Sequence, residues 1–184
     1  MNNKFIFLNF SLFFFIAACC HERGVTNKYV LTDDEKSSIP YLIDQKVNFI
    51  HSNGYEFELE VANSFLENRK TQSNHCRDGY VLYEVKELLL QSNIPLFHIT
   101  ITRTPMEIDF SMLIVVNQTS FYIDIDRLPE KSIIIGNSIY EDVYITSNNV
   151  SDKSVIVPET VWYSKKNGII QIQMTNDEKY TITN

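Results

Sequence analysis

Glycine and cysteine are scarce in this chain of 184 residues, and each scarcity argues against a class of chemistry. The five glycines are too widely scattered to form a phosphate-binding loop, and no serine lies in the G-x-S-x-G pattern of a nucleophile elbow. The three cysteines form no C-x-x-C pair and no Cys/His spacing typical of zinc. We therefore expect no cofactor, no metal and no enzymatic activity.

Basic residues are also few, and they are dispersed along the chain. There are 16 Lys and Arg against 23 Asp and Glu, which gives a formal net charge of −7. Such an acidic composition without a Lys/Arg cluster argues against a nucleic-acid partner. It argues equally against electrostatic docking on anionic lipid.

A few titratable side chains remain as candidates for chemistry. The run His75-Cys76-Arg77-Asp78 gathers three ligand types in adjacent positions, but so crowded a spacing does not favour a metal site. Asp124 and Asp126 share a strand face and could form an acid pair, although an exposed acidic face more simply indicates solvation. His98 lies among threonines and is expected to face solvent.

The N-terminal region reads as an export signal. Lys4 is followed by the uncharged, apolar run of residues 5–18. This run is shorter than the roughly 20 residues that a helix needs to cross a bilayer, and it has the length of a secretory h-region. A plain signal peptide and a buried N-terminal helix remain as alternatives.

The run ends at Ile16-Ala17-Ala18-Cys19, which resembles the lipobox of bacterial lipoproteins. The resemblance implies that the signal, residues 1–18, is cut just before Cys19. It also implies that the Cys19 thiol carries diacylglycerol and that fatty acyl chains such as palmitate anchor the protein in the membrane. Cys20, in place of aspartate, gives no sign of retention in the inner membrane. We therefore expect an outer-membrane location, with the leaflet undetermined.

The cysteines beyond the anchor are Cys20 and Cys76. An exported compartment would permit a disulfide between them. The sequence does not decide whether they pair.

Residues 19–38 are mostly polar and are predicted to be a tether, and residues 39–184 to be the folded domain. Within the tether, Thr32 is followed three residues later by Glu35, a pattern that caps a short helical turn. In the domain, Asn53-Gly54 between two alternating runs predicts a hairpin. Residues 63–78 are polar and broken, and they are predicted to be a long loop.

From Gly79 onward, alternation of apolar and polar residues predicts consecutive antiparallel strands. We prefer a strand to a helix after Gly79 because the segment begins with aromatic and β-branched residues. Phe97, Ile99 and Ile101 share one face, and a turn is expected at residues 117–120. Further strands are predicted at 132–135, 142–147, 154–157, 161–164, 169–175 and 179–183. The spacing indicates an all-β domain, a sandwich or an open barrel-like antiparallel sheet.

Four aromatic residues gather late in the chain and could line a ligand groove. They are Tyr140, Tyr144, Trp162 and Tyr163. The alternative is that they simply pack within the sheet.

A second resemblance concerns both ends of the domain. The stretches "SIYEDVYIT" and "VWYSKKNGIIQIQMTNDEKYTI", with the opening "LTDDEKSSIPYLIDQKVNFIHSNGYEFELEV", are similar to small lipoproteins of unknown function from Bacteroidetes-type bacteria. The Gly-Ile-Ile hairpin also resembles envelope proteins whose curved, half-open sheet carries lipoproteins or lipids.

Two functions remain open at this point. The first is a non-enzymatic, lipid-anchored envelope protein whose β domain makes a binding or structural contact, with an envelope protein as a candidate partner. The second is a carrier or receptor for an apolar small molecule or lipid inside a curved sheet. A deep apolar cavity would favour the carrier, and a filled core would favour the first function.

Overall fold

The computed structural model describes residues 24–72, 79–108, 111–130, 132–135, 138–149 and 154–183. The predicted signal, the predicted lipidation residue Cys19 and the segment from His75 to Asp78 lie outside the described residues, and so do Cys20 and Cys76, the two candidate disulfide cysteines.

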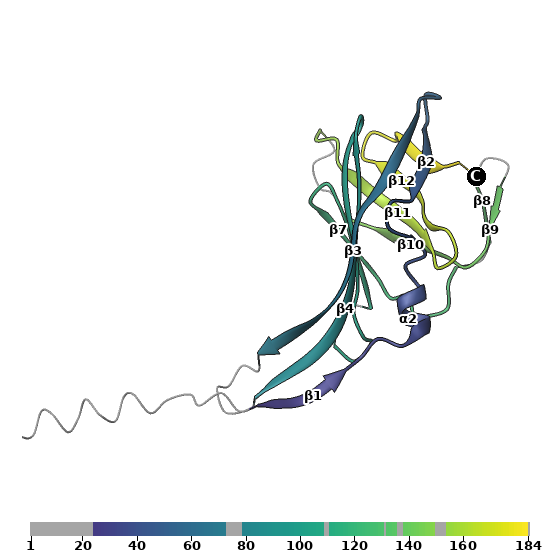
Figure 1. The fold of residues 1–184 in the computed structure, drawn as a ribbon. Coiled ribbons are helices and arrows are strands. Elements are labelled where there is room, and N and C mark those ends of the chain that lie inside the picture. Colours follow the sequence, from purple (N-terminus) through teal and green to yellow (C-terminus); the bar gives the residue numbers. More distant parts are fainter. Residues whose placement is uncertain are drawn as a thin grey trace, which may run out of the picture.

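A single antiparallel sheet curls into a nearly closed barrel (Figure 1). Its strands follow one another in the order β10-β11-β12-β13-β2-β3-β4-β5-β6-β7. The elements are β1 (Val25–Tyr29), α2 (Asp33–Ser37), β2 (Lys46–His51), β3 (Glu56–Gln72), β4 (Tyr80–Asn93), β5 (Leu96–Arg103), β6 (Met112–Val116), β7 (Thr119–Ile123), β8 (Ile133–Ile135), β9 (Ser138–Tyr140), β10 (Val143–Ser147), β11 (Pro158–Ser164), β12 (Gly168–Met174) and β13 (Lys179–Ile182). The predicted all-β, barrel-like architecture is confirmed.

The barrel closes at a seam between its two end strands, β7 and β10. In the described part of the chain these strands share no backbone ladder, and side chains join them instead. Thr146 Oγ1 donates a hydrogen bond to the Tyr122 carbonyl oxygen over 3.1 Å. Tyr144 reaches across below the seam and donates its hydroxyl to the Ile125 carbonyl oxygen over 2.9 Å.

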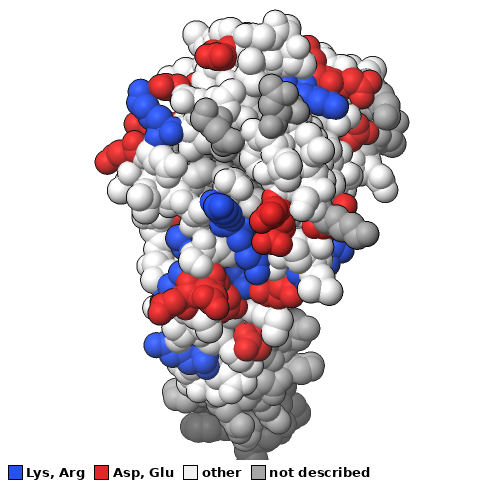
Figure 2. Space-filling model, turned by 90° about the vertical axis from the view of Figure 1, so that its right-hand side faces the viewer, with Lys and Arg blue, Asp and Glu red and all other residues white. Residues whose placement is uncertain are grey.

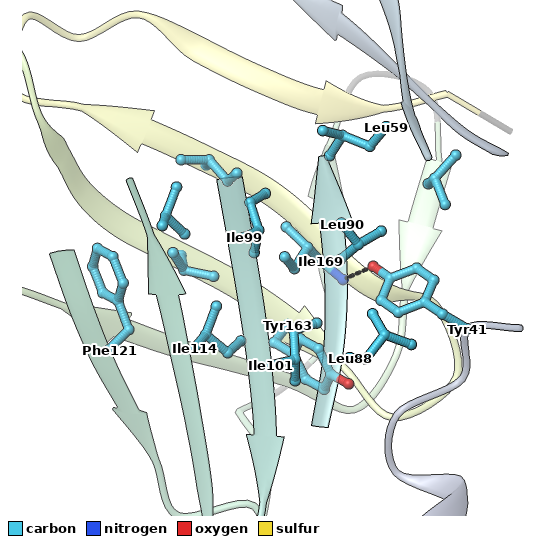
Figure 3. Close-up of a cluster of buried hydrophobic side chains, with 14 of the residues drawn as sticks. Tyr41, Leu59, Leu88, Leu90, Ile99, Ile101, Ile114, Phe121, Tyr163 and Ile169 are labelled. Atoms are coloured by element: carbon cyan, nitrogen blue, oxygen red, sulfur yellow. Dashed lines mark hydrogen bonds between the residues drawn. The ribbon is translucent and has the colours of Figure 1, made fainter. Parts of the chain in front are cut away.

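The interior of the barrel is a continuous apolar core. Along β5 the predicted alternation is confirmed, since Phe97, Ile99 and Ile101 are buried and His98 is exposed. Figure 3 shows such side chains from the facing walls of the barrel, among them Ile99 and Ile101 of β5 and Ile169 of β12, which belong to one cluster. Each fully buried side chain of this size contributes about 1.5–3 kcal/mol relative to exposure.

A small hairpin, β8–β9, forms a second layer outside the barrel. Its Tyr140 packs with Val143 and Ile170, which point outward from β10 and β12. β9 was not expected from the sequence. The strand predicted at 154–157 is wrong, because the described residues there form a turn that leads into β11.

Strands β3 and β4 extend well beyond the neighbouring barrel strand β5. The predicted loop at 63–78 is wrong as far as Gln72, because β3 continues to that residue and pairs with β4. The last six pairs, from Glu67↔Val85 to Gln72↔Tyr80, extend beyond the end of β5. There β1 pairs with β4 in parallel, and the three strands project together from the barrel (Figure 1). We call this projection the stalk.

The predicted tether differs from the structure in its second part. Residues 25–29 form β1 of the stalk, and the predicted turn is helix α2, whose capping box between Thr32 and Glu35 is present. Leu31 and Ile39 on either side of α2 are buried. We call residues 31–41, which close the stalk-side end of the barrel, the plug.

A glycine is needed at position 168, at the start of β12, because the Tyr41 side chain of the plug lies against its Cα. Its φ is +74°, and a Cβ built on it would collide with the ring and hydroxyl of Tyr41. Gly54, in the confirmed hairpin between β2 and β3, also has a positive φ of +90°, but a Cβ there would meet open space.

We predict that Gly168→Ala lowers the free energy of unfolding by about 3 kcal/mol, since it adds a steric clash to backbone strain. Gly54→Ala, the matched control, should cost roughly 1 kcal/mol through strain alone. Urea denaturation of both variants measures the difference. Equal losses of unfolding free energy in the two variants would show that the close contact between Gly168 and Tyr41 does not contribute to stability.

Candidate functional site

The four aromatic residues that were predicted to line a groove lie on opposite faces of the sheet. Tyr144 and Tyr163 are a directly opposed pair of β10 and β11, and both point into the barrel core. Tyr140 and Trp162 belong to the outer cluster under β8–β9. The structure therefore brings them together only in pairs, as packing residues of two separate layers.

Two buried tyrosines fix the plug to the barrel. The Tyr163 hydroxyl donates to the Ser38 carbonyl oxygen over 2.7 Å. The Tyr41 hydroxyl accepts from the Ile169 N–H over 2.6 Å, as the dashed line in Figure 3 shows. Burial raises the pKa of both phenols, so they remain neutral hydrogen-bonding groups.

Arg103 is the most buried charged side chain beside the plug, with 1 % of its surface exposed. Its Nη1 donates to the Ser111 carbonyl oxygen over 2.6 Å. Its Nη2 lies 3.0 Å from Asp126 Oδ1 and 3.2 Å from Glu35 Oε1. Asp126 is thus occupied in an ion pair with Arg103, and this role differs from the acid pair with Asp124 that was considered from the sequence.

Glu35 joins α2 to this buried charge. One of its carboxylate oxygens accepts from the Thr32 backbone N–H over 2.7 Å, and the other faces Arg103. Burial acts to raise the pKa of Glu35, but the hydrogen bonds from Thr32 and the charge of Arg103 outweigh burial and lower it. The ionised form therefore holds the plug in place.

Strand β4 holds the same segment from its other side. Glu84 accepts from the Leu31 N–H over 3.1 Å and pairs with Lys36 over 3.0 Å. Lys86 donates to the carbonyl oxygens of Lys36 and Ile39 over 2.7 and 3.1 Å. Desolvation lowers the pKa of Lys86, whose ammonium group is directed at carbonyl oxygens.

The surface carries several hollows, among them one of about 630 Å³ lined by residues that include Leu128 and Glu130. Two others are grooves along the barrel wall. One, of about 720 Å³, follows the seam and is lined by residues that include Tyr122, Asp124 and Arg127. The other, of about 430 Å³, lies between β13 and β8 and is lined by residues that include Ile50, Ile134 and Thr181. Both lie outside the apolar core that fills the barrel.

The two histidines among the described residues, His51 and His98, lie on different strands. His98 is exposed on β5, as expected. The His51 ring packs against the Tyr180 ring in a tilted arrangement with ring centroids 4.7 Å apart, and His51 Nε2 lies 3.7 Å from Glu178. The described residues contain no group of three His, Cys, Asp or Glu side chains arranged to hold a metal ion.

The chain enters the structure at the far end of the stalk. Val25 is level with Tyr80, and Tyr80 pairs with Gln72 in the outermost row of β3–β4. Among the residues that the structure describes, no helix has both the length and the apolar character that crossing a bilayer requires.

Comparisons with protein families, with curated proteins and with solved structures found no match.

The Glu35 contact generates a pH prediction. Because the pKa of Glu35 is lowered on folding, its stabilisation is complete above its usual value of 4.5 and is lost as the pH falls through the lower folded value. Glu35→Gln should therefore cost about 1–3 kcal/mol of unfolding free energy at pH 7 and less at pH 3.

Urea denaturation at both pH values measures this difference. Glu58→Gln is the matched control, because Glu58 forms an exposed ion pair with Lys46, of the kind that contributes little. If the cost of Glu35→Gln were the same at both pH values, its charge would play no part in holding the plug.

Proposed function

We propose that this protein is a lipid-anchored protein of the bacterial outer membrane, whose non-enzymatic β barrel makes a binding or structural contact in the cell envelope. The observation that carries the proposal is the point at which the chain enters the fold. Val25 lies in the outermost row of the stalk, whereas the barrel begins several rows further on. An acyl chain on Cys19 would thus attach to the end of a projecting β ribbon.

The distances suit such an arrangement. From Cys19 to Gly24 the chain can span at most roughly 18 Å. The six stalk pairs beyond β5 add about 20 Å at 3.4 Å per residue. The barrel would therefore stand clear of the lipid surface, with its seam and outer hairpin available to a partner in the envelope.

The filled core supports a contact function over the carrier alternative. Ligand carriers enclose a cavity that buries most of the ligand. Here the barrel interior is occupied by its own side chains, including Phe49, Leu90 and Tyr163. A small apolar ligand would be restricted to the surface grooves.

The net charge of −7 also favours a protein partner over nucleic acid. On the face that Figure 2 presents, acidic and basic side chains lie next to one another, with no broad basic field. Binding to a phosphate backbone needs a basic patch or stripe.

We predict that the wild type, expressed in a Gram-negative host, gains the mass of diacylglycerol and acyl chains and sediments with membranes. Cys19→Ala should abolish the mass increment, because the thiol that forms the thioether is gone. Intact mass spectrometry and membrane fractionation provide the readout. Cys20→Ala is the matched control and should keep the increment. A wild type that carries no lipid would refute the anchor.

A second prediction separates the contact function from the carrier. Native mass spectrometry of the purified protein should show no stoichiometric, non-covalent lipid or other apolar molecule, since the barrel interior is filled. A bound lipid that survives delipidating detergent exchange would favour the carrier.

A further inference from the structure

The outermost part of the stalk assembles basic residues that are far apart in the sequence. Lys28 of β1 is in register with Leu82 of β4, and Leu82 is in register with Lys70 of β3. The next row inward contains Arg69 and two tyrosines, Tyr29 and Tyr83. We call the described residues 24–29, 68–72 and 79–83 the stalk tip.

The charge of the stalk tip is opposite to that of the protein. It contains Lys28, Arg69 and Lys70 and, among its described residues, no Asp or Glu, although the chain as a whole carries −7. Arg69 is paired further inward with Glu67 and Glu87, at 2.6 and 2.7 Å. The two lysines are exposed and extend from one row of the ribbon.

Apolar and aromatic side chains accompany these lysines. Lys70 Nζ lies 5.0 Å from the centre of the Tyr80 ring, and Val25 is 49 % exposed. Tyrosine is enriched where membrane and water meet, because its ring is apolar and its hydroxyl is polar. Lysine places its aliphatic stem on apolar surface and its ammonium group at the level of the headgroups.

We propose that the stalk tip rests on the membrane surface, where Lys28 and Lys70 bind the phosphates of anionic phospholipid headgroups. The occupant is a lipid surface because the chain from Cys19 to the tip spans at most roughly 18 Å, and because the basic tip complements anionic headgroups. This inference rests on the proposed lipid anchor. It amounts to a second, electrostatic membrane contact that orients the barrel.

This proposal differs from the expectation, drawn from the acidic composition, that the chain does not dock electrostatically on anionic lipid. No basic cluster is visible in the sequence, because Lys28 and Lys70 are separated by more than forty positions. The parallel pairing of β1 with β4 is what places them in one row.

The test places a fluorescent probe at the tip of the full-length, lipidated protein. Trp162, the single tryptophan, is changed to phenylalanine, and Tyr80→Trp then puts the only tryptophan at the tip. The control is Ile134→Trp in the same background, at a 74 %-exposed position on the outer hairpin. Circular dichroism first establishes that each variant keeps its sheet.

Each protein is reconstituted into vesicles that contain a nitroxide-labelled phosphatidylcholine as quencher. We expect quenching at position 80, stronger with phosphatidylglycerol than with phosphatidylcholine alone, and little quenching at position 134. Lys28→Glu or Lys70→Glu should lower the ratio of docked to undocked tips by about fivefold or more. Lys179→Glu, an equal charge change at the exposed start of β13, should leave the ratio unchanged.

The outcomes separate this inference from the proposed function. A lipidated protein that sediments with vesicles but shows no quenching at position 80 overturns the tip contact and leaves the anchor intact. A wild type without lipid fails at the first step, and both proposals fall. Shielding of position 80 in detergent micelles that rises with protein concentration would assign the tip to a second copy of the chain and overturn the lipid contact.

Discussion

The β3–β4 hairpin is the element on which both parts of the molecule depend. Its twelve paired positions run without interruption from the barrel wall to the end of the stalk, apart from one irregularity beside Val61. At the barrel end its inward side chains, such as Leu88 and Leu90, are fully buried. At the other end the same two strands are covered by a single neighbour, β1. Stalk and barrel are thus one sheet, joined by a ladder of strand pairs that continues from one into the other.

The plug makes this connection rigid at the point where the barrel ends. The chain leaves β1 and must cross to the barrel interior within about ten residues, and β4 holds it on the way through Glu84 and Lys86. Further along, Tyr41 and Tyr163 hydrogen-bond backbone groups inside the barrel. Buried hydrogen bonds of this kind favour a single arrangement of the plug, because a shift would leave a donor or acceptor without its partner.

The features that were predicted correctly from the sequence are those that depend on neighbouring residues. The alternation in β5, the capping box of α2 and the turn at Asn117 depend on residues within a few positions of one another. Arg103 has the same parity as the inward-facing Ile99 and Ile101, so the pattern did contain a signal for its burial. Its partners, however, are Glu35 and Asp126, which are 68 and 23 positions away in the sequence. A local sequence pattern does not predict contacts over such separations. The stalk was missed for a related reason. The part that was missed is residues 67–72 of β3, whose side chains are all polar, and a polar run of this kind resembles a loop.

The charged side chains of β3 in the stalk protect an open strand edge from pairing with another chain. Beyond Asn63, the side of β3 that faces away from β4 has no neighbouring strand among the described residues, and such an open edge invites pairing with another chain. Charged side chains on this stretch, Glu67, Arg69 and Lys70, oppose that pairing, because a second β3 in register would bring like charges together or strip them of water. The corresponding edge of β4 is not open, because β1 pairs with it. The charges on this open edge therefore lie at the end where the chain enters, and one of them, Lys70, is also a residue of the lipid contact that we propose.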